Sequence, residues 1–148
     1  MTILPISMTI AAIAALINLW LMIRVGQMRT REKVMVGDGG NDAVIRRMRA
    51  HSNYIESTAF VLLLIVLIEL AVGPETWLWA VGGLYFAGRI AHAIGMDGPV
   101  NARFAGTLTT LLTQLGLAGM AIYIVFMTPI EVADDAALPG AAIVVAPQ

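Results

Sequence analysis

Residues 46–73 read RRMRAHSNYIESTAFVLLLIVLIELAVG, and the character of this stretch changes partway along it. Its first eleven residues include three arginines, a histidine, an asparagine and a glutamate. The next seventeen residues contain one charged residue, Glu69. A helix needs about 20 mostly apolar residues to cross the roughly 30 Å hydrocarbon core of a bilayer. The stretch therefore predicts a membrane-spanning helix that begins among polar residues.

The composition extends this interpretation to the whole chain. Of its 148 residues, 59% are hydrophobic and 13% are charged, and the mean hydropathy is +0.82. About a quarter of the residues in a soluble domain are charged, so the low charged fraction of this chain predicts that it lies in a membrane. The chain has no cysteine, which excludes disulfides, thiolate metal sites and a cysteine nucleophile of its own. A net charge of -1 indicates no nucleic-acid partner.

Four apolar segments are long enough to cross a bilayer. We expect helices at about residues 3–23, 42–72, 76–95 and 104–127. The first lacks a basic leader and a small-residue cleavage site, so we expect a retained helix and not a signal peptide. The third is the weakest because it contains Arg89 and His92. The sequence predicts an all-α integral membrane protein that forms one domain (1–148) with a four-transmembrane-helix bundle. The apolar run in the tail (128–148) is too short to span the membrane.

The segment VGDGGNDA precedes the second helix and is rich in glycine. Its three glycines are typical of turns, and either Asn41 or Asp42 can cap a following helix. A phosphate-cradling loop would need a preceding strand and a Gly-Lys-Ser/Thr sequence after it. Neither pattern is present, so we interpret the segment as a turn followed by a helix cap.

The cations are distributed unevenly along the chain. They are Arg24, Arg29, Arg31, Lys33, Arg46, Arg47, Arg49, Arg89 and Arg103. Seven of these nine lie between the first two apolar segments, and none lies near the connection at Glu75. By the positive-inside rule, the basic loops 24–49 and 96–103 are cytoplasmic and both termini are outside.

The polar residues at the start of the second helix share one face. Arg46, Arg49, Asn53 and Glu56 are spaced at i, i+3, i+7 and i+10, which places them in one stripe. Arginines at such a helix end usually anchor lipid headgroups, and this remains our interpretation for the other basic residues of the first connection. The stripe differs because Asn53 and Glu56 continue it toward the hydrocarbon.

The third helix has a matching face that contains Tyr85, Arg89, His92 and Met96. Arg89 and Glu56 each lie about 9 Å from the cytoplasmic end of their membrane-spanning segments, at a depth where an isolated charge is energetically unfavourable. We therefore expect a Glu56–Arg89 ion pair and a polar ligand shared by the groups around it. His92 is either a proton carrier or a partner in an interhelical hydrogen bond. His51 has no second ligand at suitable spacing, so we expect no metal.

The side chains of this cluster restrict the chemistry of its ligand. A guanidinium fork matches a carboxylate or phosphate, Glu56 accepts from an ammonium, and Asn53 both donates and accepts. The complement is a small zwitterion with carboxylates and an amine, together with an apolar co-substrate from the membrane lipids. An arginine beside a thiol would also lower the thiol pKa from about 8.5. The residues alone indicate an anion-binding site in the membrane that opens to the cytoplasm.

The run RMRAHSNYIE, followed by an apolar helix, resembles the R-A-x-x-N-x-x-E signature of the MAPEG superfamily, the membrane-associated proteins in eicosanoid and glutathione metabolism. The four helices, the long basic first connection and GLYFAGRIAHAIG in the third helix are also similar to that family. The resemblance extends over residues 24–127. The VGDGG loop resembles the small bacterial-type members, which implies a bacterial cytoplasmic membrane.

The resemblance implies a homotrimer that binds glutathione between neighbouring protomers near the cytoplasmic side. By position, Arg49, Asn53 and Glu56 match the residues of the second helix that hold glutathione. Arg89 joins this glutathione-binding set. Arg103 matches the arginine that stabilises the glutathione thiolate and is the expected catalytic residue.

Two residues depart from the pattern of the leukotriene synthase branch, because His92 and Met96 stand where that branch has tyrosines. His92 can still hydrogen-bond to glutathione, whereas Met96 cannot donate. The resemblance implies a membrane-bound glutathione transferase or peroxidase-like protein that directs the glutathione thiolate at a lipophilic small-molecule substrate, without a metal. The alternatives are a non-catalytic lipid- or glutathione-binding scaffold and, resting on His92 and Glu56 alone, a small transporter.

Overall fold

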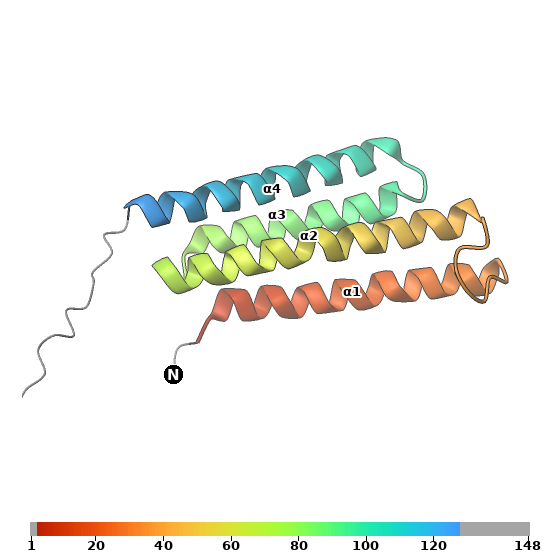
Figure 1. Ribbon diagram of the computed structural model, residues 1–148, viewed down its shortest axis with the longest axis horizontal. Helices are drawn as coiled ribbons and strands as arrows, with labels where there is room; N and C mark the ends of the chain where they lie inside the picture. Colours follow the sequence, from red (N-terminus) through yellow and green to blue (C-terminus); the bar gives the residue numbers. More distant parts are fainter. Residues whose placement is uncertain (1–2, 128–148) are drawn as a thin grey trace, which may run out of the picture.

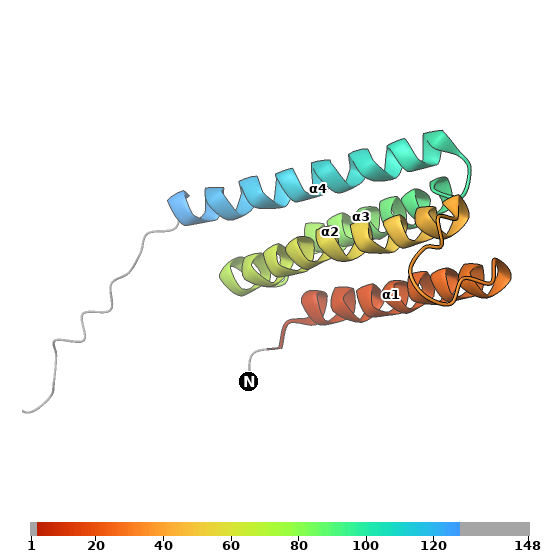
Figure 2. The same cartoon turned by 45° about the vertical axis from the view of Figure 1, so that its right-hand side comes forward.

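The computed structural model describes residues 3–127 (Figure 1). Its helices are α1 (Pro5–Arg31), α2 (Asp42–Val72), α3 (Thr76–Gly95) and α4 (Val100–Met127). They run side by side along one long axis and alternate in direction (Figures 1 and 2). The predicted all-α four-helix architecture is confirmed. The predicted tail, with its acidic residues, lies outside the described residues.

Two of the predicted helix boundaries are wrong. The bounds of α2 and α3 are those expected, but α1 ends at Arg31 and not at residue 23, and α4 begins at Val100 and not at residue 104. The error has a physical reason, because hydropathy marks where a helix leaves the hydrocarbon and not where its hydrogen bonds end. Most of the segments predicted as basic loops, 24–49 and 96–103, is therefore helical.

The first connection is the turn and cap that its glycines predict. Gly37, Gly39 and Gly40 have φ values of 69°, 61° and 67°, a region that glycine enters without strain. The side chain of Asn41 accepts hydrogen bonds from the backbone N–H groups of the second and third residues after it. Of the two candidate caps, Asn41 is therefore the one that starts α2.

The helices pack mainly in two pairs, α1 with α2 and α3 with α4, and α2 also packs against α4. Within residues 3–127, α1 and α4 make no contact. Small residues allow the backbones of α3 and α4 to come close. A Cβ atom at Gly88 would lie 2.8 Å from the side chain of Thr109, and one at Gly106 would collide with the carbonyl oxygen of Gly88.

The N-terminal end of α1 is completed by a side chain of α2. Leu4, at the cap position, makes no side-chain cap hydrogen bond. Instead, the buried carboxyl group of Glu69 accepts from the backbone N–H of Ile6 at 3.0 Å and of Ser7 at 2.7 Å, and from the Ser7 hydroxyl. Because a lipid environment supplies no water to these N–H groups, this contact satisfies donors that α1 cannot satisfy itself.

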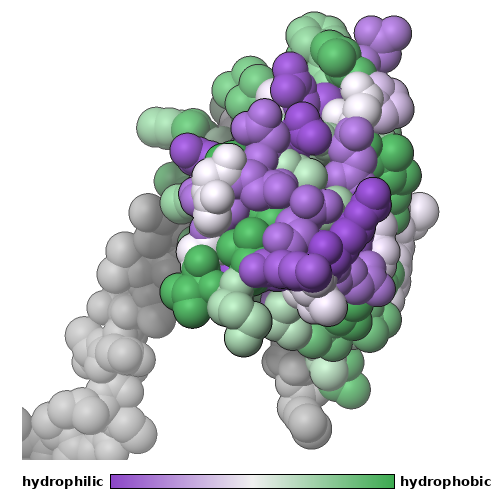
Figure 3. Space-filling model, turned by 90° about the vertical axis from the view of Figure 1, so that its right-hand side faces the viewer, coloured by the Kyte–Doolittle hydropathy of each residue, from purple (hydrophilic) through white to green (hydrophobic). Residues whose placement is uncertain are grey.

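The molecule is an integral membrane protein. Three of its helices, α1, α2 and α4, are long and apolar enough to cross a bilayer. The 20-residue α3 is about 30 Å long and packs beside them, with its two basic residues buried. Large apolar side chains such as Leu16, Phe60 and Leu115 are exposed on the outside, where lipid would surround them. Hydrophilic residues gather instead on the end where α1 ends and α2 begins (Figure 3), here called the polar end.

Candidate functional site

Two neighbouring cavities lie at the polar end among α2, α3 and α4. The first has a volume of about 210 Å³ and the second of about 240 Å³. The first is lined by Arg49, Ser52, Asn53, Glu56, His92 and Met96. The second is lined by Arg46, Gly95, Met96, Asp97, Gly98, Val100 and Arg103. Because Met96 belongs to both linings, the cavities adjoin and are described below as the polar cavities.

The structure brings together most of the residues that the sequence proposed for a site. Arg49, Asn53, Glu56 and His92 line the first polar cavity, and Arg103 lines the second. The helical stripe on α2 is therefore one wall, as its spacing indicated, and α3 supplies the opposite wall. Arg89 lines neither polar cavity.

Arg89 lies behind the first cavity, where only 1% of the residue is exposed. Its Nη1 atom donates to Asn53 Oδ1 at 2.9 Å and to Thr110 Oγ1 at 3.0 Å, and its guanidinium lies 5.7 Å from the centre of the Tyr54 ring. The predicted ion pair with Glu56 is wrong. Equal depth in two helices does not set their rotation, and α2 turns Asn53 toward Arg89 while Glu56 stays exposed.

Two buried nitrogens near the first cavity lack a partner among the described residues. They are Nε of Arg89 and Nδ1 of His92, whose residue is 6% exposed. The interhelical hydrogen bond considered for His92 is not made at this nitrogen. Unpaired buried polar atoms are rare in folded proteins, and a ligand or water is the usual explanation. The His92 ring lines the first cavity, so a ligand there could reach it.

Asp97, in the connection between α3 and α4, ties the polar end together. Its carboxylate accepts from Arg24 of α1 at 2.6 Å and from Arg47 of α2 at 3.1 Å, and Arg47 also donates to the backbone carbonyl of Arg24. Burial raises the pKa of Asp97, but the hydrogen bonds and charges of Arg47 and Arg24 outweigh burial and hold the pKa below its usual value. The two arginines interpreted as headgroup anchors therefore hold a loop.

Other cations of the polar cavities stay free. Arg46, Arg49 and Arg103 form no ion pair with any described residue. Glu56 is the acid among the lining residues whose charge is not already matched by arginines. Three guanidinium groups and one carboxylate leave a local charge of +2, since 3 - 1 = 2. The polar cavities therefore favour a ligand with more negative than positive groups.

The position of Arg103 is set by the close packing of its own backbone. A Cβ atom at Gly95 would lie 2.6 Å from Cα of Arg103 and would collide with its backbone nitrogen. The first turn of α4 therefore rests on the last residue of α3. This contact fixes the base of the Arg103 side chain at the second cavity.

Two residues that matter here were missed from the sequence. Thr110 accepts a hydrogen bond from Arg89, as Asn53 does, and Asp97 forms ion pairs with both Arg24 and Arg47. Thr110 carried no signal, because a threonine in an apolar helix usually bonds to its own backbone. Asp97 did carry one, since it is an acid in the short connection on the basic side of the chain.

Residues 7–123 match the model of the MAPEG family. The matched part covers most of the chain and includes every residue that lines the polar cavities. A search of curated proteins finds no match.

Proposed function

Because the chain belongs to the MAPEG family, we propose that it binds glutathione in the polar cavities and directs the glutathione thiolate at a lipophilic electrophile. The observation that carries this proposal is the group of three unpaired arginines around one free carboxylate at the polar end. Glutathione with an ionised thiol has two carboxylates, one thiolate and one ammonium. Its charge of -2 would balance the +2 of the cavity lining.

The polar cavities offer side chains that match functional groups of glutathione. Arg49 can pair with a carboxylate, and Glu56 can accept from the ammonium. Asn53 has its Oδ1 engaged by Arg89, which orients its amide nitrogen toward a ligand. Arg89 is thus a positioning residue, because it acts on glutathione through Asn53.

The chemical step rests on Arg103. A guanidinium remains charged at neutral pH, so Arg103 does not take the thiol proton, which passes to water, but stabilises the thiolate that forms. The thiolate sulfur attacks an electrophilic carbon of the second substrate, a C–S bond forms, and the leaving group departs with its electron pair. Against a hydroperoxide, the thiolate sulfur would instead attack the terminal oxygen, so that an S–O bond forms, the O–O bond breaks and the alkoxide leaves as the alcohol after taking up a proton. The thiol of a second glutathione would then attack the resulting sulfenic acid, which releases water and leaves glutathione disulfide.

The exposed side chains of α2 support an assembly of protomers, for which we propose a homotrimer with glutathione held between its protomers. Ser52, Asn53 and Glu56 are exposed although they follow the helix into its membrane-spanning part. Polar groups at this depth need cover from protein or ligand, because lipid offers no hydrogen bonds. By the positive-inside rule, the polar end faces the cytoplasm of a bacterial cell and both termini face outward.

The binding claim is tested by calorimetric titration of the purified protein with glutathione. In Arg49→Gln we expect affinity to fall at least tenfold, which corresponds to about 1.4 kcal/mol. Arg31→Gln is the matched control, because Arg31 lies outside both cavities and its side chain is 77% exposed. Equal affinity of Arg49→Gln and the wild-type protein would contradict the site.

The catalytic claim needs a separate readout. With Arg103→Gln we expect glutathione to bind but the ultraviolet absorbance of the bound thiolate, and turnover of an aryl halide, to be lost. Turnover that is unchanged in Arg103→Gln would exclude the proposed role of this residue.

A non-catalytic glutathione- or lipid-binding scaffold is the second candidate. The observation that favours it is Met96, which lines both polar cavities and offers no hydrogen-bond donor to a thiolate. Thermal stabilisation by glutathione, without turnover of any electrophile, would select this function.

A further inference from the structure

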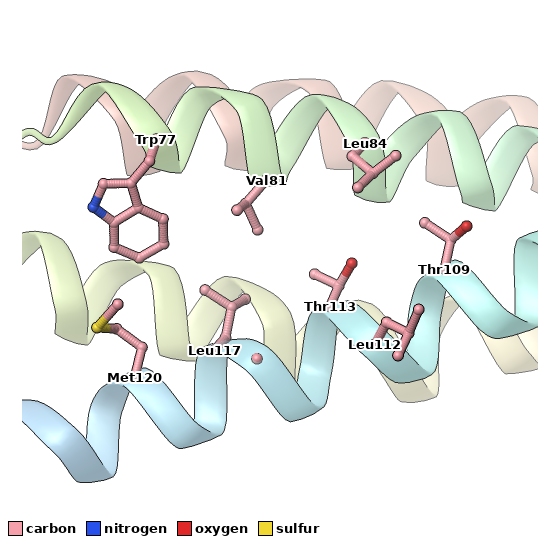
Figure 4. Close-up of a pocket in the computed structure, with 9 residues that line it drawn as sticks. Trp77, Val81, Leu84, Thr109, Leu112, Thr113, Leu117 and Met120 are labelled. Carbon is pink, nitrogen blue, oxygen red and sulfur yellow. The ribbon is translucent and has the colours of Figure 1, made fainter.

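A third cavity lies between α3 and α4 (Figure 4). Its volume is about 350 Å³, and its lining extends from Trp77 on α3 to Met120 on α4. Thr113 lies in this lining, ten residues along α4 from Arg103, which corresponds to about 15 Å of helix. The cavity is therefore near the middle of a hydrocarbon core about 30 Å thick.

The lining of this cavity carries no charge. It consists of apolar side chains, one glycine and two threonines. Leu84 and Leu112 on its rim are 61% and 60% exposed, so the cavity opens on the surface that faces lipid. Leu117, which is 2% exposed, closes its inner side. A ligand in this place would enter from the bilayer, and a charged group would find no counter-ion in the lining.

The hydroxyl group of Thr113 distinguishes the cavity from an ordinary gap between helices. The neighbouring Thr109 and Thr110 donate to backbone carbonyls one turn earlier, each at 2.9 Å. The Thr113 residue is 7% exposed, its hydroxyl makes no hydrogen bond with any of residues 3–127, and Figure 4 shows this hydroxyl pointing between the two helices. The hydroxyl is not one of the fully buried unpaired atoms of these residues, so it is accessible from the cavity. A ligand in the cavity that carries a hydrogen-bonding oxygen could therefore pair with this hydroxyl, which the lipid chains cannot do.

We propose that this cavity binds a neutral lipophile from the bilayer that carries one oxygen-containing group, such as a hydroxyl or carbonyl, hydrogen-bonded to Thr113. The apolar walls match the body of such a molecule, and the uncharged lining matches its lack of charge. None of the residues that line the polar cavities lines this one. The inference is therefore independent of glutathione binding and survives if that proposal fails.

Two glycines on α4 provide a matched pair of variants. A Cβ atom at Gly116 or at Gly119 would meet no atom within 4 Å, so a side chain can be added at either position without a clash at its first carbon. Gly116 lines the cavity, and Gly119 does not. Gly116→Leu fills the cavity, whereas Gly119→Leu adds the same side chain to the same helix outside it.

The reporter is Trp77, whose ring lies in the cavity (Figure 4). The chain has three tryptophans, so Trp20→Phe together with Trp79→Phe leaves Trp77 as the single fluorophore. In lipid nanodiscs, this protein is titrated with a terminally brominated dodecanol and, separately, with bromododecane. Bromine quenches tryptophan only on close approach, and the two probes differ by one hydroxyl group.

We expect saturable quenching of Trp77 by the alcohol, with an affinity about three- to tenfold above that of the alkane, the range of one hydrogen bond. Thr113→Val should remove this preference, because valine keeps the shape of threonine without its hydroxyl. Gly116→Leu should abolish saturable quenching and Gly119→Leu should preserve it.

Equal quenching in the two leucine variants, or an alcohol preference that survives Thr113→Val, would overturn the proposal. A change of oligomeric state confined to Gly116→Leu would also overturn it, because a second copy would then fill the cavity.

Discussion

At the scale of single residues, Asp97 connects parts of the chain that are far apart in the sequence. One carboxylate contacts Arg24 and Arg47, which lie 73 and 50 residues before it, and so connects α1 and α2 to the loop between α3 and α4. The neighbouring Met96 and, one turn into α4, Arg103 line the polar cavities. The contact therefore stabilises the loop that carries two residues of the candidate site.

Asp97→Asn should destabilise the protein in a manner that depends on pH. The folded pKa of Asp97 is lowered, so its ionised form stabilises the fold above the ordinary pKa of about 4, and this contribution is lost as pH falls through the lowered folded value. We expect a loss of about 1 kcal/mol at pH 7, since the pair is partly exposed. The difference from wild type should shrink toward pH 3.

Thermal unfolding in detergent at both pH values measures this difference in stability, with Glu75→Gln, at the end of the bundle opposite the polar end, as control. A difference independent of pH would contradict this role.

The candidate site was only partly readable from its residues. The spacing of Arg49, Asn53 and Glu56 placed them on one face because helical geometry repeats reliably along a single helix. The partner of Arg89 was predicted wrongly, since the rotation of α3 against α2 depends on packing that no spacing within one helix records. Thr110 escaped notice for the same reason, because it reaches Arg89 from a third helix.

At the scale of elements, the pair α3 and α4 depends on backbone contact. Gly88, Gly95 and Gly106 all lie where a Cβ atom would meet the other helix at less than van der Waals distance. The close approach holds the first turn of α4 against the end of α3. It also brings α4 near enough for Thr110 to hydrogen-bond with Arg89.

Gly106→Ala should destabilise this pair of helices. The added methyl group would meet the Gly88 carbonyl oxygen and lie 2.6 Å from Cβ of His92, so the helices must separate. We expect a loss of about 1–3 kcal/mol, as for other overpacked contacts. Gly119→Ala is the matched control and should be neutral or stabilising, because its methyl group meets open space and alanine favours helix. Unfolding titrations of both variants in mixed micelles measure the effect, and equal stabilities would refute the packing argument.

The whole molecule has one polar end and apolar flanks, and this asymmetry indicates its orientation in the membrane. The chain contains no cysteine, so a single introduced cysteine is an unambiguous label. In Met35→Cys the label would occupy the connection before α2, at a position that is 90% exposed, and in Ile3→Cys it would occupy the opposite end at 64% exposure. On intact cells, an impermeant maleimide should modify the second variant and not the first. Disruption of the cells should make the first reactive, and the reverse pattern would contradict the orientation.

Fold class was predictable at this scale because a bilayer permits few backbone arrangements. Four apolar segments with short connections leave an antiparallel bundle as the simple solution, and α2 and α3 have the bounds expected. The ends of α1 and α4 were not predictable from hydropathy, because both helices continue beyond the hydrocarbon through polar residues such as Gln27 and Asn101.

The hydrogen bonds of Glu69 have a consequence for modularity. The first turn of α1 is completed by a carboxyl group 62 residues away from Ser7. A foreign segment would have to present two backbone N–H groups at the same point, or leave a buried carboxyl group without donors. The first two helices thus form one indivisible part of the protein, and a chimera that divides them would separate a helix from its own cap.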